Sequence, residues 1–146
     1  MKYPLLILIG LTCLSGQNLP FKVGEKLEYT AQFNVLPVGE ATLTVVAEEL
    51  YQGKPALQVK YQASTGDVAD HLFRIRDNIN IWFDRQDMYT YRVEKKIEEG
   101  KFRKKISTFI DYYDSIAITN KDTVRINQGV RDPYSLFYYL RTRPLE

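Results

Sequence analysis

The most constraining feature of the sequence is a pair of alternating segments, residues 21–35 and 40–46, separated by Leu36-Pro37-Val38-Gly39. In both segments nearly every second residue is apolar and the residues between are polar, which places the apolar side chains on one face of a β-strand. The separating proline lacks a backbone N–H and the glycine tolerates positive φ, so we expect the chain to reverse there. The resulting antiparallel hairpin is predicted to lay its apolar face on a core, with Tyr29 and Phe33 inside it.

The same period continues along the chain. Turn signals at 51–54, 84–87 and 99–100 interrupt it, and residues 64–70 are expected to form a loop with one helical turn. Further strands are predicted at residues 57–63, 73–83, 89–97, 102–110, 116–119 and 123–126. The predicted fold is mainly β, an antiparallel meander forming a curved sheet, a sandwich or a partial barrel. Residues 17–146 are expected to form a single domain.

The period changes only near the end of the sequence. Asp132 is a good N-cap and Pro133 a good first helical residue, which predicts a helix through about Arg141. The helix is apolar nearly all round. We therefore expect it to be covered on most sides, within this chain or by a partner.

Residues 1–16 have the pattern of a signal peptide. Lys2 precedes an apolar run of about ten residues, which is too short to cross a bilayer, and cleavage is predicted before Gln17. The mature chain is then expected in the periplasm or outside the cell, with no transmembrane segment. The alternative keeps Cys13 as a lipid anchor, although Thr12 stands where such sites have a small residue. A mature charge near +1 (19 basic minus 18 acidic residues) argues against nucleic acid as a partner.

Groups that carry out chemistry are scarce. His71 is the single histidine, and it lacks the sequence context of a catalytic triad. A metal site would need several His, Cys or carboxylate ligands, so no metal, cofactor or catalytic residue is predicted. Asp77 with Asp84 or Asp87, near Trp82, would suit a glycan hydrolase. Turn capping is the favoured role for these carboxylates.

Basic residues surround the turn at Glu99-Gly100. Lys95-Lys96 precede it and Arg103-Lys104-Lys105 follow it, with glutamates interleaved. Cross-strand charge pairing is the favoured interpretation. A patch for nucleic acid or lipid head groups is the alternative.

The chain is rich in tyrosine, with 11 Tyr and 7 Phe among 146 residues. Tyrosine combines an apolar ring with a polar tip, which suits a pocket for an amphiphile or a glycan. Core filling is the alternative for each single residue. The candidate ligand-binding residues are Trp82, Tyr89, Tyr91, Tyr134, Tyr138 and Arg141.

Four segments together resemble the exported bacterial family known as domain of unknown function 3108. They are Phe21 to Tyr29, Val38 to Ala41, Arg76-Asp77 with Asp84, and Asp132 to Arg141. The resemblance implies a mainly β protein of the cell envelope and no established activity. In that family more β sequence follows the helix, so a chain ending at Glu146 is expected to leave the helix partly exposed. The motif positions, expected to be structural, are Gly24, Glu25, Gly39, Glu40, Arg76, Asp77, Asp84, Asp132 and Ser135.

Three functional hypotheses follow. The favoured one is a non-catalytic binding module of the cell envelope that holds a lipid-like or glycan ligand under the helix from Asp132 to Arg141. The second is an interaction or assembly protein that docks this helix on an envelope protein. The third is the carboxylate-based hydrolase.

Overall fold

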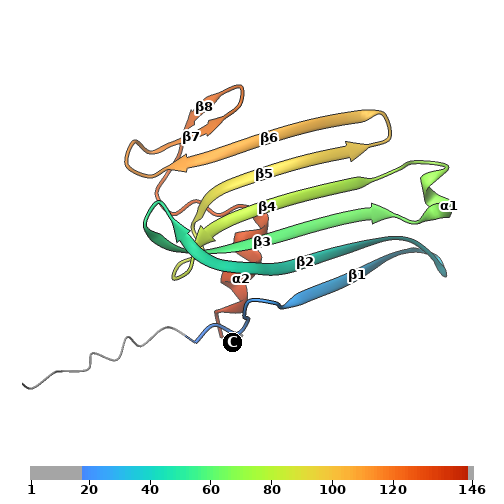
Figure 1. The fold of residues 1–146 in the computed structure, drawn as a ribbon, viewed down its shortest axis with the longest axis horizontal. Helices are drawn as coiled ribbons and strands as arrows, with labels where there is room; N and C mark the ends of the chain where they lie inside the picture. The colour runs from blue at the N-terminus through green and yellow to red at the C-terminus, as the bar shows by residue number, and fades with distance from the viewer. Residues whose placement is uncertain (1–17, 145–146) are drawn as a thin grey trace, which may run out of the picture.

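The computed structural model describes residues 18–144, so the predicted signal peptide and Cys13 lie outside the described residues. Eight strands form one open antiparallel sheet in which each strand pairs with the next along the chain (Figure 1). The strands are β1 (Lys26–Phe33), β2 (Leu36–Tyr51), β3 (Lys54–Thr65), β4 (Arg76–Asp84), β5 (Thr90–Glu99), β6 (Phe102–Asp111), β7 (Ile116–Thr119) and β8 (Thr123–Arg125). The helices are α1 (Asp67–Asp70) and α2 (Pro133–Arg141). The predicted meander with a C-terminal helix is confirmed, and of the three predicted forms the sheet is the open one.

The first hairpin turns earlier than predicted. The two residues of the turn are Asn34 and Val35, and Asn34 has φ of 53°, a conformation that asparagine tolerates better than most residues. The expected reversal at residues 36–39 is therefore wrong. Pro37 lies inside β2, beside a register shift in the pairing with β1, where a missing N–H is tolerated. Gly39 also lies inside β2, and a Cβ there would approach the Ser64 carbonyl oxygen to 2.8 Å.

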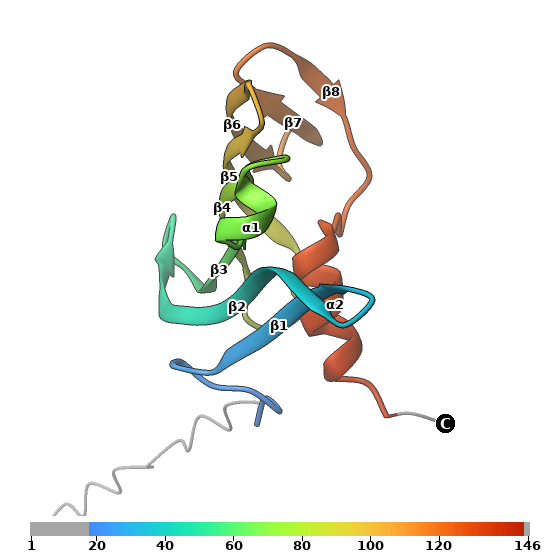
Figure 2. The same ribbon diagram turned by 90° about the vertical axis from the view of Figure 1, so that its right-hand side faces the viewer.

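The two faces of the sheet differ. We call the face that packs against α2 the helix-side face and the opposite one the outer face. Figures 1 and 2 show that α2 crosses the helix-side face near one end of the strands, whereas α1 lies at the other end. The core lies between α2 and the sheet, and its largest fully buried side chains include Tyr138, Phe83, Ile81, Met88, Val45 and Val59.

Because α2 is only nine residues long, it leaves much of the helix-side face uncovered. Leu27 still packs against the core. Farther along β1, Tyr29 is 48% exposed and Phe33 70% exposed. The expectation that Tyr29 and Phe33 lie in the core is wrong, because the alternation gives the face of a side chain but not what covers it. Neither described helix is long and apolar enough to cross a membrane.

Candidate ligand-binding face

The first turn of α2 is fixed to β5 by a buried polar cluster. The Asp132 carboxylate accepts the backbone N–H groups of Tyr134 (2.8 Å) and Ser135 (3.3 Å), as expected of an N-cap. It also accepts the Thr90 hydroxyl at 2.6 Å, and the hydroxyl oxygens of Thr90 and Ser135 lie 2.9 Å apart. Thr90 and Ser135 are buried. These groups satisfy one another away from water, so they hold the start of α2 in one position.

The last turn of α2 is held by an ion pair. Arg141 donates from Nη1 and Nη2 to the two carboxylate oxygens of Glu25, at 2.5 and 3.0 Å. Glu25 lies just before β1, and hydrogen bonding to it raises the pKa of Arg141. The guanidinium also lies 5.2 Å from the ring centroid of Phe21. Arg141, a predicted ligand contact, is therefore engaged by the protein itself.

The space beneath α2 is filled by aromatic rings. Tyr138 is fully buried, and its ring centroid lies 4.7 Å from that of Phe21 and 5.7 Å from that of Phe83. Burial raises the pKa of the Tyr138 hydroxyl. The predicted position of a ligand, under the helix, is thus occupied by the core itself.

Beside α2, the helix-side face presents apolar side chains to solvent. The register places Tyr29 opposite Ala41, Ala41 opposite Ala63, and Ala63 opposite Asp77. The row of three apolar residues therefore continues into the Asp77 carboxylate in β4. Ile97 lies on the same face in β5 and packs at the margin of the core. We call Tyr29, Ala41, Ala63 and Ile97 the open strip. The two alanines are short, so the surface is low between the larger side chains at either end of the strip.

Two tyrosines border the open strip on the side of α2. Tyr134 of α2 packs on Tyr61 of β3, with ring centroids 5.1 Å apart. Burial raises the pKa of both hydroxyls, and the charge of Asp77 raises them further. Both groups are therefore neutral near pH 7, and each can donate or accept a hydrogen bond. The border of the strip thus consists of apolar tyrosine rings that end in polar hydroxyl groups.

Asp77 and Asp84 occupy opposite ends of β4. The Asp77 carboxylate accepts the backbone N–H of Glu98 at 3.1 Å and so bridges β4 and β5. The Asp84 carboxylate accepts the backbone N–H groups of Gln86 and Asp87 and caps the turn. The two acids are seven residue steps apart along the strand, a separation of about 23 Å. That span exceeds the roughly 10 Å that a glycosidase uses, whether Asp77 is paired with Asp84 or with Asp87.

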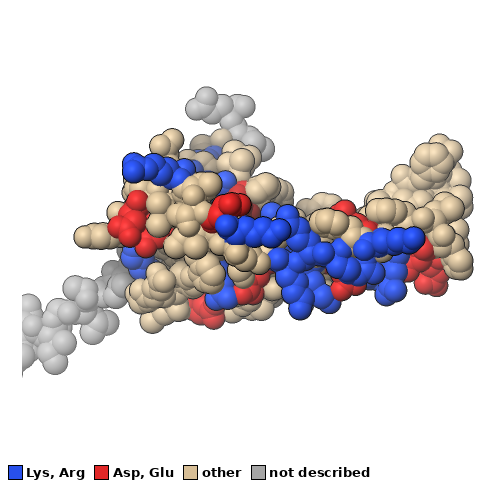
Figure 3. Space-filling model, turned by 90° about the horizontal axis from the view of Figure 1, so that it is seen from above, with Lys and Arg blue, Asp and Glu red and all other residues tan. Residues whose placement is uncertain are grey.

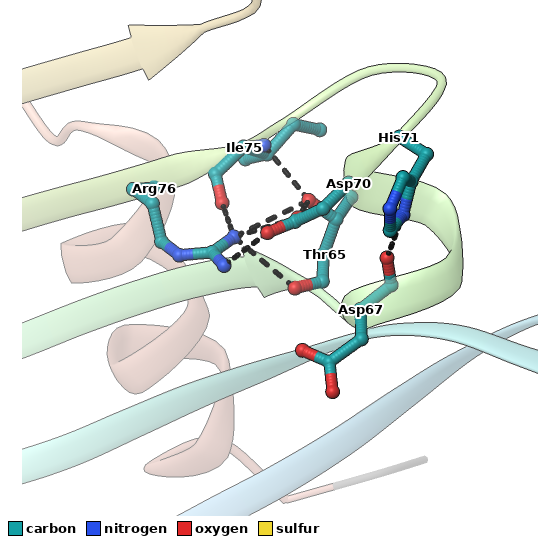
Figure 4. Close-up of polar contacts among 6 residues, drawn as sticks. All are labelled: Thr65, Asp67, Asp70, His71, Ile75 and Arg76. Atoms are coloured by element: carbon teal, nitrogen blue, oxygen red, sulfur yellow. Dashed lines mark hydrogen bonds and ion pairs between the residues drawn. The ribbon is translucent and has the colours of Figure 1, made fainter.

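A second polar cluster joins α1 to the sheet at the far end of the strands (Figure 4). Arg76 donates from Nη2 to Asp70 at 2.5 Å and from Nη1 to the Thr65 carbonyl at 3.1 Å, and the Thr65 hydroxyl also donates to Asp70. Hydrogen bonds from Arg76 and then Thr65 lower the pKa of Asp70. His71 points away from this cluster, and its Nδ1 contacts the Asp67 carbonyl at 2.7 Å. The cluster fastens α1 in place, whereas the hydrogen bond of His71 is made to the backbone of Asp67 within the same short segment.

Other predicted ligand-binding residues lie on the outer face. Trp82 donates from Nε1 to Glu49 at 2.7 Å, and the Arg92 guanidinium lies between the rings of Trp82 (5.1 Å) and Phe109 (4.8 Å). Tyr91 stacks on Tyr51 in an open hollow of about 360 Å³. Burial, with Asp84 nearby, raises the pKa of Tyr91 to about 12.

Tyr89 lies between the two groups. The Arg131 guanidinium is 4.4 Å from the ring centroid of Tyr89 and 3.7 Å from that of Tyr139 in α2, and Tyr112 packs against both Tyr89 and Tyr91. The six predicted ligand-binding residues are therefore divided. Tyr134, Tyr138 and Arg141 belong to α2, whereas Trp82 and Tyr91 lie on the opposite face. The structure does not bring them together into one pocket.

The rest of the outer face is polar. Two open hollows of about 550 and 410 Å³ share Asn78 and Lys96. Charged, amide and hydroxyl side chains make up most of their linings, as expected for the solvated side of an antiparallel sheet. Within residues 18–144, no three His, Cys, Asp or Glu side chains form a group that could hold a metal ion.

The family model described as "Protein of unknown function (DUF3108)" matches residues 28–146. The chain belongs to the DUF3108 family. No curated protein and no solved structure matches it. Membership in DUF3108 therefore brings no known activity to this chain.

The residues that carry the resemblance to DUF3108 mostly support the fold. Gly24 has φ of 91° and donates its N–H to the Val45 carbonyl at 2.9 Å, which sets the entry to β1. Arg76, Asp77 and Asp84 each join or cap backbone segments, as described above. Glu40 is exposed and lines the larger outer hollow.

Sequence reasoning missed several residues of this DUF3108 chain that the structure makes important. Thr90 links β5 to α2, but nothing in its local sequence signals a partner 42 residues away. Tyr61 borders the open strip. Its position in a predicted strand indicated only that its side chain lies on the apolar face of the sheet. Asp70 lies in a segment expected to be a loop with a helical turn, where an acidic residue is ordinary.

Proposed function

We propose that this DUF3108 chain is a non-catalytic binding module of the cell envelope whose open strip holds the apolar part of an amphiphile. The observation that carries the proposal is the apolar row beside α2, in which Tyr29 is 48% exposed and Ala41 and Ala63 are partly exposed. Tyr29, Ala41 and Ala63 share one face of three neighbouring strands, and α2 ends short of them. An amphiphile lying there would bury apolar surface that now faces water, which is favourable.

The shape of the face favours a slender ligand. Ala41 and Ala63 form a low floor with Tyr29 at one end, and Asp77 and then Ile97 follow at the other. The Tyr61–Tyr134 pair borders this floor. Tyrosine rings give apolar contact while their hydroxyls meet polar parts of a ligand. The polar hollows of the outer face suit a glycan better than an alkyl chain, so a glycan would be expected to bind on that side. The amphiphile is the proposal because the apolar row is the larger departure from an ordinary solvated surface.

A binding assay with a neutral amphiphile tests this function. Dodecyl maltoside below its micellar concentration should bind the mature protein in titration calorimetry. Ala63→Trp raises the floor of the open strip and should lower the affinity at least tenfold. Gln62→Trp is the matched control, because Gln62 is the preceding residue of β3 and lies on the outer face.

Three results would overturn the proposal. They are the absence of binding by any amphiphile, an equal loss in Gln62→Trp, or unchanged binding in Ala63→Trp. If Ala63→Trp does not fold, Tyr29→Ser serves instead, because Tyr29 is half exposed and its removal leaves the core intact. Circular dichroism and the unfolding midpoint establish that each variant is folded.

A second candidate function is docking of α2 on an envelope protein that presents an apolar groove. Leu136 and Leu140 are one helical turn apart, and they are 43% and 58% exposed. Apolar residues at this spacing are typical of a helix that binds in a groove. Leu136→Glu with Leu140→Lys should abolish capture of such a partner while leaving amphiphile binding unchanged. Loss of amphiphile binding instead would favour the first function.

We also propose that the protein works outside the cytoplasm, in the periplasm or secreted. The support is the signal-peptide pattern of residues 1–16. The intact mass of the protein recovered from its host should correspond to a chain beginning at Gln17. A mass showing lipid on Cys13 would make it a lipoprotein. Recovery of the full precursor in the cytoplasm would contradict export.

A further inference from the structure

The basic residues near the β5–β6 turn are divided between the two faces of the sheet. Figure 3 shows Lys and Arg side chains gathered along the edge of the sheet that carries these strands. The alternation of β5 and β6 places Lys96, Arg103 and Lys105 on the outer face and Lys95 and Lys104 on the helix-side face.

Most of these basic residues on the outer face form ion pairs with an acidic side chain. Lys96 lies 2.7 Å from the Glu98 carboxylate, and Arg103, which is opposite Glu98 in the register, lies 3.6 Å from it. The predicted pairing of charges is therefore present on this face. Neither Lys95 nor Lys104 forms an ion pair with an acidic side chain of residues 18–144.

Lys95 and Lys104 lie at the margin of the open strip. Lys95 is opposite Ile106, and Lys104 is opposite Ile97, itself a member of the strip. The two lysines are diagonal neighbours, with backbones about 7–8 Å apart. Lys95 is half-buried among apolar neighbours, whereas Lys104 is exposed. Their flexible stems allow both ammonium groups to reach one anionic group between them.

We infer that the ligand of the open strip is a single-chain amphiphile with an anionic head, a carboxylate or a phosphate, held by Lys95 and Lys104. This inference rests on the proposed function. The head lies over β5 and β6, and the chain runs across the strands toward Tyr29 in β1. Four strand spacings of about 4.8 Å make that path about 19 Å long, which is the scale of an extended alkyl chain.

Asp77 faces the same side of the sheet and sets the direction of the ligand. Its carboxylate is tied to the Glu98 backbone N–H and is not paired with Lys95. An anionic head is repelled by Asp77, so it lies on the β6 side of Lys95, toward Lys104. The chain carries no charge for Asp77 to repel, and it leaves this carboxylate in contact with water, because burying a charge beneath hydrocarbon is costly.

The chain offers a matched pair of variants. Lys95→Gln with Lys104→Gln removes two positive charges from the helix-side face. Lys96→Gln with Lys105→Gln removes the same charge from the adjacent residues of the same strands, on the outer face. Binding is measured for laurate, dodecyl phosphate, dodecyl maltoside and dodecyltrimethylammonium, all below their micellar concentrations, and for inorganic phosphate alone.

Laurate and dodecyl phosphate should bind the wild-type protein at least tenfold more tightly than dodecyl maltoside, and dodecyltrimethylammonium more weakly. The helix-side variant should lose this tenfold advantage, keep its affinity for dodecyl maltoside and show no salt dependence. The outer-face variant should keep the advantage within a factor of about two, because its charges lie across the sheet. Inorganic phosphate should not compete, because it lacks the chain.

The inference is overturned if the two variants lose anion affinity equally, if the helix-side variant keeps the advantage, or if inorganic phosphate competes with laurate. In these cases neutral dodecyl maltoside still binds, and the proposed function survives. If no amphiphile of any charge binds, the proposed function fails as well.

Discussion

Arg141, at the end of α2, forms a two-point ion pair with Glu25, which lies 116 residues earlier in the chain. The two side chains are only 25% and 21% exposed, so water screens the pair less than it would at the surface. This contact fastens the end of α2 to the segment that enters β1, and it thereby fixes the helix beside the open strip.

Removing one partner of this pair should destabilise the fold. Glu25→Gln keeps the shape but leaves the guanidinium without its counter-charge, and we expect a loss of about 1–3 kcal/mol. Arg141→Lys keeps the charge but loses the two-point geometry, so it should also be destabilising, though less so. Urea unfolding followed by circular dichroism measures both. Glu40→Gln, at an exposed position, is the control and should change stability by less than about 0.5 kcal/mol. A Glu25→Gln protein as stable as the control would contradict the role of the pair.

The buried cluster at the start of α2 gives a second prediction. Thr90→Val keeps the size of the side chain but leaves Ser135 and the Asp132 N–H without the Thr90 hydroxyl. Such unpaired buried groups cost about 1–3 kcal/mol. We also expect amide hydrogen exchange in the first turn of α2 to accelerate more than exchange in β2 or β3. Thr30→Val, at an exposed position in β1, should leave both measurements unchanged. Equal stability of the two variants would show that Thr90 does not hold the helix.

Several features were predictable from local chemistry. The helix from Pro133 to Arg141 and its Asp132 cap follow from residues adjacent in sequence, and the structure confirms both. Turns with a glycine or a cluster of polar residues were also found where predicted. The first hairpin was the exception, because Asn34 supplies the positive φ while Pro37 is tolerated at a bulge.

The candidate site was less predictable, because it depends on what lies across from each face. Tyr29 and Phe33 have the pattern of core residues, yet α2 is too short to cover them. Trp82 and Tyr134 both looked like ligand contacts, but alternation in β4 turns Trp82 away from the face that α2 covers. The alternation of a β-strand predicts that Lys95 and Lys104 lie on one face and Lys96 and Lys105 on the other. That Lys95 and Lys104 have no acidic partner within the described part of the chain could be seen only from the structure.

The cluster of Thr65, Asp70 and Arg76 predicts an acid-sensitive α1. Hydrogen bonds lower the pKa of Asp70 in the folded protein relative to the unfolded chain, where it is about 3.9. The stabilisation is therefore complete above that value and is lost as the pH falls through the lower, folded pKa. Asp70→Asn should reduce stability at neutral pH and flatten the acid limb of a plot of unfolding midpoint against pH. Asp67→Asn, in the same short helix, is the control. An unchanged acid limb in Asp70→Asn would contradict this assignment.

The position of the bound chain is the central claim, and methyl NMR tests it most directly. With methyl-labelled alanine and isoleucine, titration with laurate should shift the resonances of Ala41, Ala63 and Ile97 progressively and saturably. The side-chain amides of Asn78 and Asn80, on the outer face, should stay in place. Shifts confined to Asn78 and Asn80, with Ala63 and Ile97 unmoved, would contradict the account and move the binding site to the other side of the sheet.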